Sequence, residues 1–94
     1  MVSYQKKNIY ECAISAYGLN AQMDMLIEEM SELTTALLHY RRGREANISE
    51  EIADVQIMLE QVIQFFEIEI EVDVQKNRKL RRLAERLGIG GSEE

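Results

Sequence analysis

The sequence contains no proline, no tryptophan and only one cysteine, Cys12. Because proline is the commonest residue to break a helix, its absence permits long helices almost anywhere in the chain. A single cysteine cannot form an internal disulfide, and a free cysteine is usually a small buried hydrophobic residue. The composition therefore favours a reducing, cytoplasmic setting.

Long apolar segments and excess positive charge are also missing. Residues 1–7 lack the apolar run of a signal peptide, and no stretch approaches the ~20 apolar residues that span a bilayer, so we expect a soluble protein with no membrane partner. The chain has 11 Lys and Arg against 17 Asp and Glu, a net charge of −6. This balance argues against a nucleic-acid polymer, which needs clustered cations. It does not exclude a free nucleotide, because a bound metal ion reverses the local charge.

What the sequence does have is helical periodicity. Its 94 residues, 46% hydrophobic and 30% charged, suit one globular domain over residues 1–94, with 88–94 as a flexible tail. Apolar residues recur at spacings of three and four, which predicts an all-α fold, a four-helix bundle. The expected helices cover residues 3–17, 20–42, 47 or 49 to 66, and 70–87.

Several residues suit the ends of these helices. Gly18 is placed to end the first helix, Asn20 to cap the second, and either Asn47 or Ser49 to cap the third. Residues 67–74 alternate strictly between polar and apolar, the pattern of a β-strand. A lone strand would leave its backbone groups unpaired, so we predict a bend that leads into the fourth helix.

Each expected helix has an inward-facing apolar row. The two central helices carry theirs at heptad positions a and d, a pattern typical of helices packed side by side. These rows are Leu19, Met23, Leu26, Met30, Leu33 and Leu37 in one helix, and Ile52, Val55, Leu59, Val62 and Phe66 in the other. The outer helices are expected to point inward Ile9, Cys12, Ala13 and Ala16 in the first, and Leu80, Leu83 and Leu87 in the last.

Two pairs of acidic residues lie on one flank of the central rows. Glu29 and Glu51 fall at heptad position g, and Glu32 and Asp54 fall at position c. In an antiparallel helix pair the g positions of the two helices face each other, so the shared flank brings both pairs to one groove. The glutamate that precedes each g position falls at f and faces water.

The two pairs reach the same level only if the connection between their helices runs backwards. About 10 residues of helix, at ~1.5 Å each, separate Glu32 from the end of its helix, whereas Asp54 lies about one turn inside the next. A straight hairpin would misplace the pairs by roughly 10 Å. The connection 43–48 can extend ~20 Å and so can make up the difference.

Four carboxylates in one groove repel one another unless a hard divalent cation binds them. Mg²⁺ suits such an all-oxygen ligand set, with water and phosphate oxygens in its remaining positions, and two such ions could activate a water for hydrolysis. The alternative is that these acids belong to a solvated helix surface and to a helix N-terminus, where negative charge is favourable. The matched flanks of the two pairs favour the metal site.

The same residues resemble a known family. Residues 28–33, EEMSEL, and residues 50–55, EEIADV, are similar to the EExxEL and EExxDV motifs of the MazG-like all-α nucleotide pyrophosphohydrolases. The likeness covers about residues 17–87. The run 17–24 that leads into the first motif is similar to small, single-domain, phage-type members.

The resemblance implies a Mg²⁺-dependent hydrolase, with Mn²⁺ as a substitute. It would cleave a ribo- or deoxyribonucleoside triphosphate between the α and β phosphates, to a monophosphate and pyrophosphate, and work as a homodimer or homotetramer. By position, Glu29, Glu32, Glu51 and Asp54 would be the metal ligands. Glu29 or Glu32 would also orient or deprotonate the attacking water, which makes these two the candidate catalytic residues.

The family's last helix usually offers a Lys and an Asn followed by a basic residue. Here Lys79, Arg82 and Arg86 fall on the same c and g flank and would contact the β and γ phosphates. Leu83 stands where the Asn is expected, a departure from the family pattern. Gln22, one heptad before Glu29, is a candidate to read a nucleobase edge. A solvated surface is the alternative for these polar residues.

A second function stays open at this point. A helical module that kept the fold for nucleotide sensing or assembly, and lost efficient catalysis, would combine the same carboxylates with incomplete phosphate donors. Turnover of a nucleotide in the presence of Mg²⁺ distinguishes the two.

Overall fold

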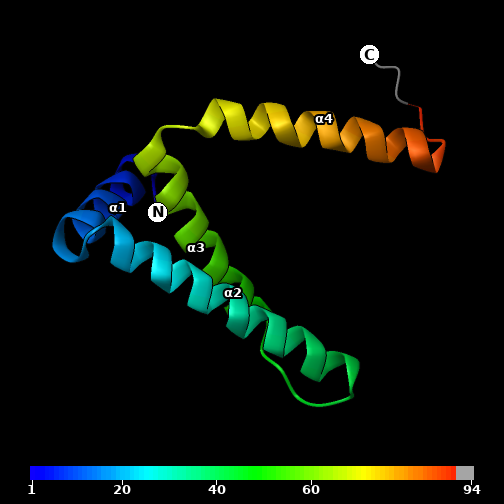
Figure 1. Cartoon of the computed structure of the whole chain (residues 1–94), viewed down its shortest axis with the longest axis horizontal. Helices are drawn as coiled ribbons and strands as arrows, with labels where there is room; N and C mark the ends of the chain where they lie inside the picture. The colour runs from blue at the N-terminus through cyan, green and yellow to red at the C-terminus, as the bar shows by residue number, and fades with distance from the viewer. Residues whose placement is uncertain (91–94) are drawn as a thin grey trace.

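The computed structural model describes residues 1–90, and in that range it holds four helices and no strand (Figure 1). The helices are α1 (Ser3–Tyr17), α2 (Leu19–Arg41), α3 (Ile48–Phe66) and α4 (Glu69–Leu87). The all-α prediction is confirmed, and every helix end lies within one residue of its expected position. The expected tail begins at Gly88, which ends α4, but residues 91–94 lie outside the described range.

Short-range interactions set the helix boundaries. Gly18 alone separates α1 from α2, and its φ of 89° lies in the region that favours glycine. Asn47 is the N-cap of α3, because its side-chain oxygen accepts a hydrogen bond from the backbone N–H of Glu50 at 3.2 Å. The expected capping by Asn20 is wrong, since α2 already begins at Leu19 and leaves Asn20 within its first turn.

The alternating segment 67–74 contains a bend and then a helix, as predicted. Glu67 adopts the left-handed conformation at φ 54°, and its N–H donates to the carbonyl of Gln64 at 3.1 Å. The N–H of Ile68 donates to the carbonyl of Ile63 at 3.2 Å. These two hydrogen bonds form a Schellman motif, which satisfies the last carbonyls of α3 and sets the direction in which α4 leaves.

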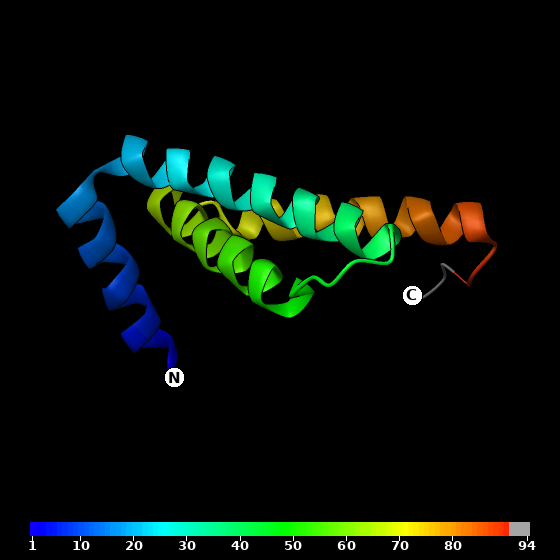
Figure 2. The ribbon, with the colours of Figure 1, turned by 90° about the horizontal axis from the view of Figure 1, so that it is seen from below.

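The antiparallel helices α2 and α3 form the most extensive contact in the chain, and α1 packs across both at one end (Figures 1 and 2). The connection from α2 runs back along α2 before α3 begins, as the level of the carboxylates requires (Figure 2). The least exposed side chains come from these three helices. They are the apolar Tyr10, Ala36, Val55 and Met58 and the polar Gln22 and Gln61.

The rotation of α2 and α3 differs from the prediction. The two helices face each other through positions d and g, where Val55, Ala36 and Met58 are buried. The small Ala36 permits close approach on the g side, and Gln22 at another g position is hydrogen-bonded into the interior. Five of the six predicted core residues at position a are therefore 39–48% exposed, whereas the sixth, Met23, is half-buried. The five exposed residues are Met30, Leu37, Ile52, Leu59 and Phe66.

The outer helices also expose residues that were predicted to face inward. In α1 the hydroxyl of Tyr10 donates to the carboxylate of Glu60 at 2.6 Å, and this contact turns Tyr10 inward and leaves Ile9, Cys12 and Ala16 exposed. Only Ala13, of the four predicted residues, is half-buried. In α4, Leu80, Leu83 and Leu87 are exposed because this helix makes only a weak contact with the rest of the chain.

The chain is extended for its size. Its radius of gyration is 16.7 Å, whereas a compact domain of this length has about 12 Å. Its accessible surface is 7542 Å², compared with roughly 5,600 Å² for a compact monomer of this mass. Within residues 1–90, no helix has both the length and the apolar character that crossing a membrane requires.

The capping assignment can be tested with two asparagines. We expect Asn47→Ala to lower the free energy of unfolding by about 1 kcal/mol, because it removes the N-cap of α3. Asn20→Ala, by contrast, places a better helix former inside α2 and should be neutral or slightly stabilising. Thermal unfolding followed by circular dichroism, at one protein concentration, measures both variants. Equal destabilisation by the two changes would contradict the assignment.

Candidate metal centre

The structure brings the four predicted carboxyl groups together across α2 and α3. Glu29 and Glu32 come from the middle of α2, and Glu51 and Asp54 come from the first two turns of α3. Glu32 and Asp54 both act on the carboxyl group of Glu29, and Glu32 and Asp54 likewise act on Glu51 through their negative charges. The acids are thus close in space although the two pairs are about 20 residues apart in sequence.

Exposure separates three of these four acids from their neighbours. Glu29, Glu51 and Asp54 are half-buried, whereas Glu32 lies at the exposed edge. The adjacent acids on each helix, Glu28 and Glu50, are exposed as their heptad position predicts.

The environment of Glu29 favours its protonated form. Burial raises the pKa of Glu29 from 4.5 to about 7, and its hydrogen bond with Glu32 and the negative charges of Asp54 and Glu32 add to the shift. Two carboxyl groups can share a hydrogen bond only when one of them carries a proton. In residues 1–90 the one ion pair joins Lys6 to Glu60, so no Lys or Arg in that range forms an ion pair with the four acids.

Among the four acids, Glu51 has a carboxylate oxygen that lacks a hydrogen-bond partner. Burial raises its pKa, followed by the negative charges of Glu32, Asp54 and Glu50. Its Oε1 atom is buried and has no hydrogen-bond partner among the described residues. A buried carboxylate oxygen without a partner carries a desolvation cost, and in native proteins such atoms often contact an ion or an ordered water.

The donor set fits a hard divalent cation, because it consists of carboxylate oxygens from two facing helices. The acids do not stand in a ready-made coordination geometry, however. Within residues 1–90, no three His, Cys, Asp or Glu side chains are arranged to hold an ion as they are. The four carboxyl groups therefore interact through their charges and hydrogen bonds, and binding an ion would require their side chains to converge.

Gln22, the candidate base reader, lies in the interior of the helix pair. Its amide nitrogen donates to Oε1 of Gln61 at 2.7 Å, and both side chains are buried. Gln61 was missed from the sequence, although the signal was there. It lies one heptad after Asp54, just as Gln22 lies one heptad before Glu29, so the same register that joins the acids also joins the two amides.

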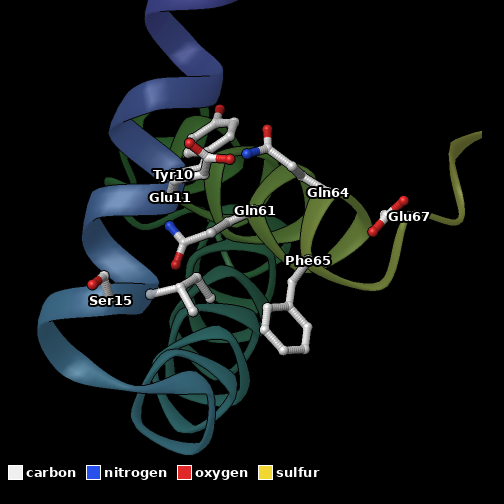
Figure 3. Close-up of a pocket in the computed structure, with 8 residues that line it drawn as sticks. Tyr10, Glu11, Ser15, Gln61, Gln64, Phe65 and Glu67 are labelled. Carbon is white, nitrogen blue, oxygen red and sulfur yellow. The ribbon is translucent and has the colours of Figure 1, made fainter.

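A cavity of about 280 Å³ opens beside Gln61, between α1 and the end of α3. Figure 3 shows the amides of Gln61 and Gln64 extending from α3 towards Tyr10 and Glu11 of α1. Phe65 and Glu67 line the far side. The cavity therefore combines aromatic rings with amide and carboxyl groups about one heptad away from the four acids.

The predicted phosphate-binding residues do not reach the acids within one chain. Lys79, Arg82 and Arg86 lie on α4, which extends away from α2 and the start of α3 (Figure 1). All three are exposed, as is Leu83 at the position of the expected Asn. The structure thus joins the two acidic motifs and leaves the basic residues apart from them.

No protein-family model, curated protein or solved structure matches this chain.

The raised pKa of Glu29 predicts a pH dependence of stability. Between pH 4.5 and about 7 the folded chain binds more protons at Glu29 than the unfolded chain, so the free energy of unfolding falls as pH rises. This contribution is fully present below pH 4.5 and is lost as pH rises through about 7. Urea unfolding in EDTA should show this fall for the wild type and a smaller fall for Glu29→Gln, which cannot ionise.

Glu28→Gln is the matched control, because Glu28 is the exposed neighbour on the same helix. It should keep the slope of the wild type. If Glu29→Gln and Glu28→Gln give the same slope, the carboxyl of Glu29 is not the group that couples stability to pH.

Proposed function

We propose that this protein is a Mg²⁺-dependent nucleotide pyrophosphohydrolase, with Mn²⁺ as a substitute for Mg²⁺. It would cleave a ribo- or deoxyribonucleoside triphosphate between the α and β phosphates, releasing the monophosphate and pyrophosphate. The resemblance of residues 28–33 and 50–55 to the MazG-like motifs suggests this reaction. The observation that carries the proposal is the unpartnered, buried Oε1 of Glu51 within a group of four interacting acids.

The assigned ligands are Glu29, Glu32, Glu51 and Asp54. Together they place up to four negative charges on one helix pair, where no Lys or Arg of residues 1–90 forms an ion pair with them. Retaining such a cluster is costly without a cation, because like charges at short range disfavour ionisation. When bound, Mg²⁺ supplies the compensating charge, attracts phosphate oxygens and lowers the pKa of water.

Glu29 is the best candidate to hold the proton of the attacking water, with Glu32 as the alternative. In the metal-free chain, burial and the neighbouring acids raise the pKa of Glu29 to about 7, a value that suits a general base at neutral pH. The water oxygen forms a bond to the α phosphorus, and the bond from that phosphorus to the oxygen that bridges it to the β phosphorus breaks. The carboxylate accepts the water's proton, and pyrophosphate leaves with the electron pair of the broken bond.

The cavity between α1 and α3 suits the nucleoside part of the substrate. It lies about one heptad, or ~10 Å, from the acids along α3. Its aromatic rings and amides can stack on a base and hydrogen-bond to its edge. Gln22 would act there through Gln61, which it holds in place by the 2.7 Å hydrogen bond.

One observation favours a second function, a nucleotide-sensing or assembly module. Lys79, Arg82 and Arg86 lie apart from the acids in the single chain, and Leu83 replaces the expected Asn. A protein of this kind would bind a nucleotide with Mg²⁺ but turn it over slowly. We place either activity in the cytoplasm, where the exposed Cys12 would stay reduced.

Charge-removing variants test the reaction. We expect Glu29→Gln and Glu51→Gln to lower Mg²⁺-dependent pyrophosphate release by at least ~10²-fold, comparable to losing one electrostatic stabiliser in other enzymes. The exposed controls Glu28→Gln and Glu50→Gln should keep most of it. The assay incubates each variant with a panel of ribo- and deoxyribonucleoside triphosphates and identifies the products.

The loss of pyrophosphate release in each of the four variants distinguishes the hydrolase from the sensing module. Equal loss in all four would contradict the assignment of the inward-facing acids. No pyrophosphate from the wild type with any nucleotide, together with measurable nucleotide binding, would favour the sensing module.

Metal binding can be tested without a substrate. Mg²⁺ or Mn²⁺ should raise the melting temperature of the wild type relative to EDTA, because an ion that binds only the folded state stabilises it by about 2.7 kcal/mol at 100 times its dissociation constant. Glu51→Gln should abolish the increase, and Glu28→Gln should retain it. Superimposable wild-type melting curves in EDTA and in millimolar Mg²⁺ would rule out the metal site.

A further inference from the structure

The cavity between α1 and the end of α3 carries charge of one sign. Among the described residues that line it, Glu11 and Glu67 are acidic and none is Lys, Arg or His. The one ion pair of residues 1–90 joins Lys6 to Glu60, so neither acid of the cavity is neutralised in this way. A ligand with a positive charge would therefore meet two opposite charges here without displacing an ion pair.

A neighbouring hollow extends this acidic surface. It shares Glu11 and Glu67 with the cavity and adds Glu69 and Glu71 from the first turn of α4, against the single cation of Lys7. These acids come from α1, from the bend after α3 and from α4. The fold thus gathers negative charge from three parts of the chain around one opening.

Gln61 supplies a hydrogen-bond donor inside the cavity. Its side chain is only 3% exposed, and its Oε1 accepts the hydrogen bond from Gln22 at 2.7 Å. This bond fixes the amide so that its nitrogen points the other way, and that nitrogen donates to no group in residues 1–90. Figure 3 shows the nitrogen on the side of the cavity that faces α1. A buried N–H without a partner favours a ligand that brings an acceptor.

Two aromatic rings complete the cavity. The hydroxyl of Tyr10 donates to Glu60 at 2.6 Å, which holds the ring of Tyr10 in place. The ring of Phe65 lies edge to face with that of Phe66, with centroids 5.1 Å apart. The face of an aromatic ring attracts a cation and also stacks on a nucleobase.

These features together describe a flat cation that also carries a hydrogen-bond acceptor. A metal ion or a simple amine has the charge but offers no acceptor to Gln61. An ordinary nucleobase has acceptors and a flat ring but no charge. A base alkylated on a ring nitrogen has all three, because alkylation makes the ring positive and leaves other ring nitrogens or carbonyl groups to accept a hydrogen bond.

We propose that this cavity selects a nucleotide whose base is positively charged through alkylation of a ring nitrogen. Glu11 and Glu67 compensate the charge, Gln61 donates to an acceptor of the base, and Tyr10 and Phe65 contact the ring. This inference rests on the proposed function, since it names the class of triphosphate on which the four acids act.

Two isomeric nucleosides test the selection without phosphate or metal. In 1-methyladenosine the methyl group gives the base a positive charge at neutral pH, whereas in N6-methyladenosine the same group leaves the base neutral. NMR titrations of the whole chain in EDTA measure both dissociation constants. We expect 1-methyladenosine to bind about 10-fold more tightly, from its cation–π contact and the two opposite charges. Equal affinities, tighter binding of the neutral isomer or no binding of either would overturn the proposal.

Variants locate the effect in the cavity. Glu11→Gln should weaken the binding of 1-methyladenosine about 3-fold and leave N6-methyladenosine unchanged, because it removes one exposed charge. Glu45→Gln is the matched control, since it makes the same change in the exposed connection at the other end of α3. Equal weakening by both variants would show that the net charge of the chain, not the cavity, attracts the cation.

The same titration with spermidine tests whether the ligand is a base. Spermidine carries positive charge without an aromatic ring or an acceptor, so it should bind more weakly than 1-methyladenosine. Phe65→Leu should weaken the binding of both nucleosides, because it removes a stacking surface, and leave that of spermidine unchanged. Spermidine that binds as tightly as 1-methyladenosine and shifts the same resonances would overturn the selection of a base.

Hydrolysis of the corresponding triphosphates separates this inference from the proposed function. With Mg²⁺, kcat/KM should be about 10-fold higher for the cationic isomer, in proportion to its binding. Selective nucleoside binding with no pyrophosphate from any triphosphate would contradict the proposed reaction and support the cavity assignment. Hydrolysis of both triphosphates at equal kcat/KM, with equal nucleoside affinities, would support the reaction and overturn the selection of a cationic base.

Discussion

The antiparallel packing of α2 on α3 is the constraint on which the rest of the structure depends. Its register is set where small and apolar side chains, Ala36, Val55 and Met58, are buried between the helices. The hydrogen bond between Gln22 and Gln61 fixes the same register, since two buried amides must be at one level to satisfy each other. A shift by one turn of either helix would break this pair and separate the two acidic motifs.

This register has an electrostatic consequence. The same face that brings the amides together brings four carboxyl groups together one heptad away. Burial and mutual repulsion then raise the pKa values of Glu29 and Glu51. These ionisable side chains occupy half-buried positions where apolar side chains would stabilise the fold more, so the site lowers the stability of the fold. Such a conflict is typical of functional sites.

The exposed apolar surface of the chain consists of side chains that the α2–α3 pair does not bury. Turning positions d and g inward leaves position a outside, and the bend at Glu67 sends α4 away from the body of the chain. Both features expose apolar area, and the position of α4 raises the radius of gyration above the compact value. The acidic α2–α3 pair and the basic end of α4 are oppositely charged parts of one chain, which gives the exposed surfaces an electrostatic preference as well as an apolar one.

The sequence by itself determined the four helices and the grouping of the four acids. Periodicity of apolar residues is a local signal, and caps such as Asn47 and Gly18 act within one helical turn, so neither needs the tertiary structure. The heptad positions of Glu29 and Asp54 also place both residues on the flank where two antiparallel helices meet, and these positions follow from sequence spacing alone. Only the tertiary structure decided which apolar positions are buried. The apolar spacing alone favours a core of positions a and d, because position g includes polar residues. The observed core of positions d and g depends on Ala36 and on the Gln22–Gln61 pair across 39 residues of sequence. It also decided that α4 stands apart, because the direction of a helix after a two-residue bend depends on the backbone angles of Glu67, which hydrophobic spacing does not encode.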